Sequence, residues 1–73
     1  MLDESPARVV NLRPVSIHGL TFVDVALALP DGRTLDARLG PEAVPDDLAV
    51  GDEVVAVSAM ANVLELRRPP PET

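Results

Sequence analysis

The segment TFVDVALALPDGRTLDARL (21–39) constrains the fold more than any other part of this 73-residue chain. Apolar residues alternate with polar or small ones on both sides of a central turn signal, as in a half-buried strand. Pro30 presets a turn, and Asp31 and Gly32 are expected to supply its positive-φ positions. The segment therefore predicts an antiparallel β-hairpin with one strand on each side of residues 30–33. Its inward face would carry Val23, Val25, Leu27, Leu29, Leu35, Ala37 and Leu39.

The rest of the chain repeats this pattern of short strands and turn residues. Further strands are expected over 8–17, 52–57 and 63–66, and the connection after the hairpin has room for at most one short helical turn, over 42–44. Pro14 has no N–H for a β-ladder, so it predicts an edge position or a bulge in the first strand. Five short strands predict an all-β fold, a small and partly closed antiparallel barrel of the OB type.

The ends of the chain contrast with this barrel. We expect a flexible segment over 1–7, the barrel domain over 8–67 and a proline-rich disordered tail over 68–73. A chain this short, without cysteine for disulfides, has marginal stability on its own, so self-association is expected. The sequence shows neither a signal peptide nor about 20 consecutive apolar residues, so a cytoplasmic protein without direct membrane insertion is expected.

The charge balance argues against nucleic acid and against catalysis. Twelve acidic residues face six arginines and no lysine, and Phe22 is the only aromatic residue. An OB-type nucleic-acid binder, which needs a basic stripe and stacking aromatics, is therefore the weakest functional alternative. With no lysine or cysteine, and with His18 interpreted as a turn residue, we expect neither catalytic residues nor a metal site. Asp24, in mid-strand, is expected to pair with Arg33 or Arg38 across the hairpin.

Two segments of the chain resemble a known family. VALALPDGRTLDARL, then a loop, then LAVGDEVVAVSAMANVLEL is similar to the TOBE/Mop family of molybdate-related, OB-type β-barrel domains, most strongly over 48–57. The resemblance implies a module of the kind found as free-standing molbindins, in molybdate-responsive regulators and at the C-terminus of ABC-importer ATPases. It also implies a homo-oligomer, a dimer or larger, and an ABC-transporter ATPase as a partner.

The same resemblance implies where an oxyanion would bind. Molybdate or tungstate is the expected ligand, and the candidate residues are Arg8, Asn11, Ser58 and Asn62. Binding members carry an Ile-Lys-Ala/Ser-Ser/Thr segment after the Gly-Asp strand, and here Ala59 stands in place of the lysine. A tetrahedral dianion is held by backbone N–H groups, hydroxyls and few cations, so the donor set of this chain is reduced.

Two functional hypotheses stay open at this point. The first is a non-catalytic TOBE-like module, linked to ABC importers or oxyanion handling, that acts through self-association or docking. The second is a genuine molbindin-like carrier that holds molybdate or tungstate at a subunit interface. The apolar segment near residue 60 supplies the interface candidates Ala59, Met60, Ala61 and Val63.

Overall fold

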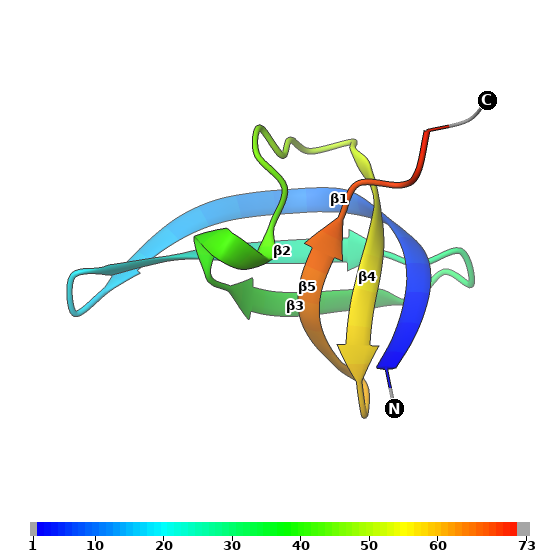
Figure 1. The fold of residues 1–73 in the computed structure, drawn as a ribbon, viewed down its shortest axis with the longest axis horizontal. Helices are drawn as coiled ribbons and strands as arrows, with labels where there is room; N and C mark the ends of the chain where they lie inside the picture. The colour runs from blue at the N-terminus through cyan, green and yellow to red at the C-terminus, as the bar shows by residue number, and fades with distance from the viewer. Residues whose placement is uncertain (1, 72–73) are drawn as a thin grey trace.

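The computed structural model of the protein describes residues 2–71 and contains five β-strands and one 3₁₀ turn (Figure 1). The strands form one antiparallel sheet in the order β3-β2-β1-β4-β5. The edge strands β3 and β5 approach each other, but the described residues form no ladder between them. The sheet is thus curled into a barrel that stays partly open, which confirms the predicted all-β architecture in a loose form. The elements are β1 (Leu2–Ile17), β2 (Leu20–Ala28), β3 (Thr34–Leu39), η1 (Pro41–Ala43), β4 (Glu53–Ala59) and β5 (Asn62–Arg67).

Strand β1 joins the two halves of the sheet. Its first part, residues 2–8, pairs with β4, and its second part, residues 8–17, pairs with β2. The register of the β1–β2 pair shifts between Val9 and Asn11, where the strand changes partner. Each part has a hydrogen-bonded neighbour on one side only, so prolines are tolerated there as in an edge strand. The edge position expected for Pro14 is therefore found.

The first strand begins earlier than the sequence pattern indicates. Residues 2–7, expected to be a flexible segment, form the first part of β1 because β4 supplies their hydrogen-bond partners. The tail also differs at its start, since Arg68 donates to the Asp52 carboxylate and to the Asp46 carbonyl, each at 2.9 Å. Residues 69–71 belong to no strand or helix, and residues 72 and 73 of the expected tail lie outside the described residues.

The hairpin between β2 and β3 has the predicted strands but a different turn. Leu29 and Arg33 pair through a backbone bond of 2.8 Å, and the Gly32 N–H donates to the Leu29 carbonyl at 3.0 Å. Gly32 has a φ of 90°, whereas Asp31 does not have the positive φ that was expected, so that prediction is wrong. The loop is a turn followed by a left-handed glycine, a common three-residue hairpin connection. Asp31 instead accepts hydrogen bonds from the backbone and the guanidinium of Arg33.

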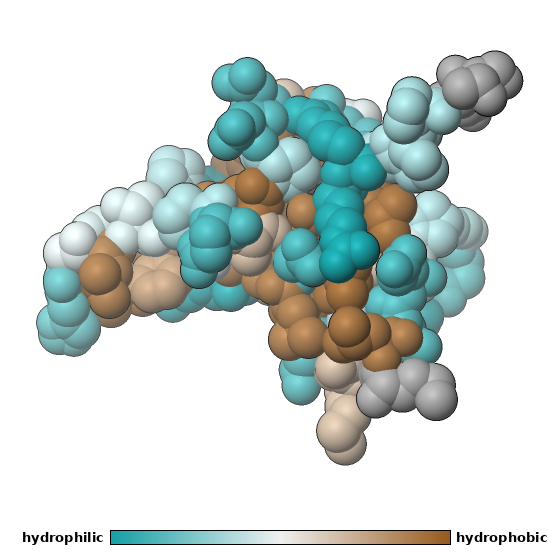
Figure 2. All heavy atoms as spheres, viewed as in Figure 1, coloured by the Kyte–Doolittle hydropathy of each residue, from teal (hydrophilic) through white to brown (hydrophobic). Residues whose placement is uncertain are grey.

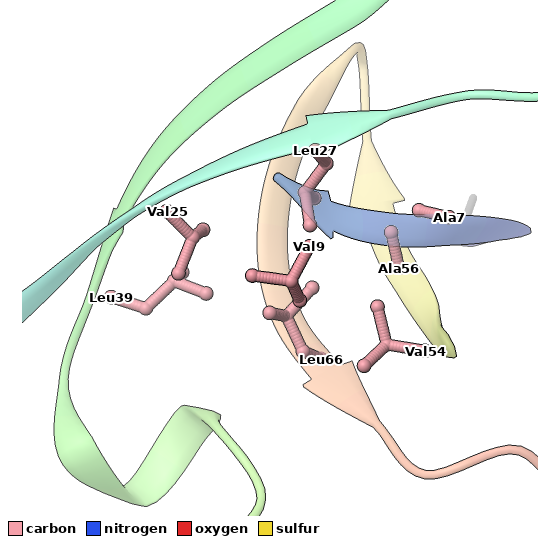
Figure 3. Close-up of a cluster of buried hydrophobic side chains, with 8 residues drawn as sticks. All are labelled: Ala7, Val9, Val25, Leu27, Leu39, Val54, Ala56 and Leu66. Atoms are coloured by element: carbon pink, nitrogen blue, oxygen red, sulfur yellow. The ribbon is translucent and has the colours of Figure 1, made fainter. Parts of the chain in front are cut away.

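The core is built from small aliphatic side chains of all five strands (Figure 3). Val9, Leu27 and Val54 are at most 1% exposed, and no polar side chain is buried within residues 2–71. The period-two alternation predicted for the hairpin is confirmed, since all its inward positions except the half-buried Leu35 belong to the core or pack against it. The buried cluster consists of Ala7, Val9, Val25, Leu27, Leu39, Val54, Ala56 and Leu66.

The β1–β2 hairpin extends beyond the barrel as a two-stranded arm, seen at the left of Figure 1. Its tip is a two-residue turn in which His18 and Gly19 have φ values of 50° and 78°. The interpretation of His18 as a turn residue is confirmed. Turns of this left-handed kind match the twist of the flanking strands, and glycine adopts them without strain.

Candidate functional site

The structure places the candidate oxyanion residues on different parts of the sheet. Arg8 lies opposite Glu53, and its guanidinium donates to the Glu53 carboxylate at 2.8 Å. Ser58 lies opposite Asp3, five residues further along β4 than Glu53. At the usual rise per residue, Ser58 is therefore about 17 Å along the sheet from the position of Arg8. Asn62 is the first residue of β5 and follows the turn at that same end of the sheet.

The fourth candidate, Asn11, lies apart from the other three. It is at the register shift of β1, and its Oδ1 accepts a hydrogen bond of 2.9 Å from the Leu12 N–H. It borders a hollow on the outer face of β1, β2 and β3, which neither Arg8 nor Ser58 reaches. One chain therefore does not bring the four predicted side chains into a single site.

Every arginine of the chain lies in an ion pair with a carboxylate. Two of them, Arg13 and Arg38, share Asp24, and the other four have separate acidic partners. The pairs are largely exposed, so each contributes little to stability. Together, however, they leave no uncommitted guanidinium for a dianion within the described residues. The other pairs are Arg8–Glu53, Arg33–Asp31, Arg67–Glu65 and Arg68–Asp52.

The pair on the outer face of the hairpin confirms one of the expected contacts of Asp24. Arg38 donates two hydrogen bonds to its carboxylate, at 2.7 and 3.0 Å, and Arg13 adds a longer one of 3.4 Å. The hydrogen bonds from Arg38 lower the pKa of Asp24, and Asp24 in turn raises the pKa of Arg38. The adjacent hollow of about 520 Å³ is also bordered by Asp36, so its two positive and two negative charges cancel.

The Gly-Asp pair at the start of β4 has a structural role. Gly51, with a φ of 97°, donates its N–H to the Val9 carbonyl at 2.7 Å. The Asp52 carboxylate accepts from the Ala49 N–H at 3.0 Å and from Arg68 at 2.9 Å. These bonds, the backbone one first, lower the pKa of Asp52. The pair thus ties β1, the start of β4 and the residue after β5 together.

The candidate interface residues surround the turn between β4 and β5. The stretch SAMAN was expected to be a link between strands ending at 57 and beginning at 63, but Ser58 and Ala59 belong to β4 and Asn62 belongs to β5. Only Met60 and Ala61 form the turn, and the Met60 side chain is 91% exposed. The predicted link over residues 58–62 is therefore wrong, and a tight hairpin stands in its place.

This turn uses an uncommon backbone conformation for its residues. Met60 and Ala61 have φ values of 51° and 69°, in the left-handed region. A residue with a Cβ loses about 1–2 kcal/mol there, so glycine or asparagine normally fills such positions. Backbone of this kind concentrates at functional sites, where other demands on the side chains outweigh the local cost.

A hollow of about 390 Å³ opens at the same end of the barrel, and we call it the mouth. Figure 2 shows apolar side chains, in brown, gathered at the lower end of β4 and β5. The apolar residues of its lining, which we call the apolar wall, are Leu29, Leu35, Ala56, Ala61 and Val63. The polar residues, which we call the polar wall, are Asp3, Ser5 and Ser58, with Glu4 and Arg33 completing the lining, and Ser5 and Ser58 lie next to the apolar Ala56 and Val63 in the sheet.

A comparison with protein families matches a model described as the TOBE domain over residues 6–64. The chain belongs to the TOBE family. TOBE domains are non-catalytic binding or regulatory modules, and the match indicates a role related to molybdate or to ABC transporters. No curated protein and no solved structure matches the chain.

Two further observations describe what this TOBE domain contains. Residues 2–71 have no grouping of three or more histidine, aspartate or glutamate side chains that would hold a metal ion. Their only helical element is η1, so they include no helix with the length and apolar character of a membrane span.

Sequence reasoning missed the polar wall of the mouth of this TOBE domain. Asp3 and Ser5 fell in the segment expected to be flexible, so their side chains were not considered for the site. The sequence carries no clear strand signal for them, because residues 2–6 lack an apolar period and pairing with β4 places them in a strand. Leu29 and Leu35 were predicted to point inward, and they do, but at the open end of the barrel.

Proposed function

We propose that this TOBE domain is a non-catalytic contact module, linked to ABC importers or oxyanion handling, that works through self-association or docking at its mouth. The observation that carries this proposal is the engagement of all six arginines by carboxylates while a further carboxylate, that of Asp3, faces Ser58. A dianion at Ser58 would meet this negative charge without a compensating cation. The charge arrangement supports contact with a macromolecule over anion capture.

Apolar exposure at the same end supports the contact role. Leu2 pairs with Ala59 at the end of β4 and is 61% exposed, and Met60 lies next to it in the turn. Apolar side chains grouped at one rim are typical of a protein–protein contact surface. The candidate interface residues Ala59, Met60, Ala61 and Val63 all lie at this rim or line the mouth.

An oxyanion carrier is the second candidate function. Its support is that Ser58, one of the expected oxyanion residues, lines a hollow that is open to a second copy of the chain. In this alternative, molybdate or tungstate lies at the interface between copies, and exposed ion pairs rearrange to supply its cations.

Thermal unfolding with molybdate, tungstate and sulfate separates the two functions, because a ligand of the native state raises its stability by mass action. Sodium chloride at matched ionic strength is the control. We expect molybdate and tungstate to raise the melting temperature no more than sulfate does, since sulfate stabilises folded proteins non-specifically relative to chloride. A saturable increase with molybdate or tungstate alone, lost in Ser58→Ala, would establish the carrier function instead.

Light scattering across a concentration series tests the contact role. Where the contact is with a second copy of the chain, association should weaken in Met60→Glu, since this change places a charge at the rim without disturbing the core. Leu20→Glu is the matched control, because Leu20 is 63% exposed at the tip of the arm, away from the mouth. Equal weakening by both changes would contradict a contact surface at the mouth. A clean monomer at all concentrations would remove self-association and leave docking on another protein.

A further inference from the structure

We propose that the mouth receives a lysine side chain of a partner polypeptide, with the ammonium group bound by Asp3 and the aliphatic stem lying along the apolar wall. This inference rests on the proposed function, because it names the chemistry of the partner that docks at the same surface. It differs from the oxyanion alternative in the sign of the charge that the mouth accepts.

The polar wall offers hydrogen-bond acceptors on neighbouring positions of β1 and β4. Strand alternation puts Asp3 and Ser5 on the same side of β1 as the buried Ala7, so their side chains are on the inward side at the open end. Ser58 lies directly opposite Asp3 on β4. A carboxylate accepts only, and hydroxyls accept as well, which together match the three N–H donors of an ammonium group.

The charge of Asp3 is not matched from within the chain. Across residues 2–71 Asp3 has no ion pair, whereas six other carboxylates are paired with arginines. Arg33, the one arginine that lines the mouth, is held by Asp31 at 2.6 Å through its side chain and at 3.0 Å through its backbone. Among residues 2–71 no arginine is left to pair with Asp3, so this carboxylate is open to a cation from a partner.

The apolar lining beside these acceptors suits the stem of a lysine. Leu29, Leu35 and Val63 supply aliphatic surface, and lysine side chains commonly bury their methylene groups along such surface while the ammonium group reaches a polar partner. An ammonium group is a compact donor with three rotatable N–H bonds, unlike the planar guanidinium fork of arginine. Leu2 and Met60 expose further apolar surface at this end, next to the mouth. Residues of the partner on either side of its lysine can contact this surface, which favours a polypeptide over a free amine.

The partner is a different protein from a second copy of this one. The sequence contains no lysine, and its arginines are engaged as described above. The net charge of −6 also attracts a basic partner over long range and speeds the encounter. A lysine flanked by apolar residues, in an extended segment of a basic protein, fits these observations.

A peptide titration tests this inference. The probe is a short acetylated and amidated peptide with one central lysine between valines, and its control has norleucine in place of the lysine, which keeps the stem and removes the charge. We expect the lysine peptide to bind the full chain at least about tenfold more tightly than the norleucine peptide. Isothermal titration calorimetry measures both.

A matched pair of variants locates the contact. Asp3→Asn keeps the shape of the side chain and should weaken the lysine peptide about tenfold, whereas Asp36→Asn removes a charge from the outer face of β3 and should have little effect. Circular dichroism confirms that both variants are folded. Equal binding of the two peptides would overturn the role of the cation. If both substitutions weakened binding of the lysine peptide equally, the net charge of the chain would explain the binding, and a specific contact at Asp3 would be ruled out.

Failure of this inference and failure of the proposed function give different results. If neither peptide binds at millimolar concentration while light scattering still shows association that depends on Met60, the lysine proposal is wrong and the contact module stands. If molybdate stabilises the chain and the lysine peptide does not bind, both are wrong.

Discussion

The buried core and the mouth are made from the same strands, but their side chains differ in burial and in polarity. In the core, Val9, Leu27 and Val54 are almost fully buried, and every member of the cluster is aliphatic. At the mouth, leucine and valine side chains share a hollow with the carboxylate of Asp3 and two hydroxyls. The core is arranged for stability, whereas the mouth carries groups that a fold alone does not require.

The two tight turns of the sheet repeat this contrast. The arm closes with His18 and Gly19, and glycine suits the left-handed conformation there. The hairpin at the mouth closes with Met60 and Ala61 in the same conformation, although both carry a Cβ. The turn at the mouth thus carries two residues with a Cβ in this conformation and the arm carries one, His18, so the local backbone cost is larger at the mouth, as is common at functional sites.

The largest expected effect separates the core from the mouth. Leu27 and Leu35 lie opposite each other on β2 and β3, but Leu27 is fully buried and Leu35 is half-buried at the mouth. Leu27→Ala should lower the free energy of unfolding by about 2–5 kcal/mol, and Leu35→Ala by about 1 kcal/mol or less. Urea unfolding measures both. Similar losses would show that the mouth is packed as part of the core.

The next effect concerns the strained turn. Replacing Met60 by asparagine and Ala61 by glycine should raise the free energy of unfolding by about 1–2 kcal/mol, because these residues adopt positive φ at lower cost. His18→Asn in the arm is the control and should change it by less than about 0.5 kcal/mol. A loss of stability in the double variant would contradict the left-handed assignment of this turn.

A smaller gain is expected from the polar wall. Asp3→Val puts a β-branched apolar residue at an inward-facing strand position and should stabilise the domain by about 0.5–1 kcal/mol. The same variant should lose binding of the lysine peptide, so that stability and contact change in opposite directions. Chemical unfolding and calorimetry on the same sample would reveal this, and a variant that is less stable would argue that Asp3 has a structural partner.

The smallest effect is the acid response of the paired carboxylates. The pKa values of Asp24, Asp31 and Asp52 are lowered by their hydrogen bonds from the ordinary value of 3.8. The folded state therefore binds fewer protons than the unfolded state in this range, and the stability from these groups is present above about pH 4 and is lost as the pH falls further. Asp24→Asn and Arg38→Gln should each make the free energy of unfolding, measured by urea unfolding at several pH values, fall less steeply below about pH 4. A slope equal to that of the wild type in both variants would contradict the role of the pair.

Local patterns predicted much of the fold, and long-range pairing explains what they missed. The hairpin of β2 and β3 was predictable because its alternation is regular and its turn carries proline and glycine. The start of β1 was not, because Leu2 to Pro6 lack an apolar period and are held in place by β4, which lies some fifty residues away in sequence. The turn at Met60 and Ala61 escaped prediction because neither residue is a turn signal.

The candidate site was predicted only in part, for the same physical reason. The candidate interface residues near Met60 lie at the mouth, but the other residues that line it come from β1 and from the β2–β3 hairpin, far away in sequence. Pairs such as Arg8 with Glu53, which remove a cation from a prospective anion site, join residues far apart in the chain. Neither Arg8 nor Ser58 shows in the sequence alone that it faces a carboxylate.

The most direct test of a contact surface at the mouth is a map of backbone amide chemical shifts during titration with the lysine peptide. We expect the changes to concentrate at residues 2–5, at Leu29 and Leu35, and at residues 58–63, while the outer face around Asp24 and Arg38 stays unchanged. Changes confined to that outer face, with none at the mouth, would contradict the assignment of the contact surface.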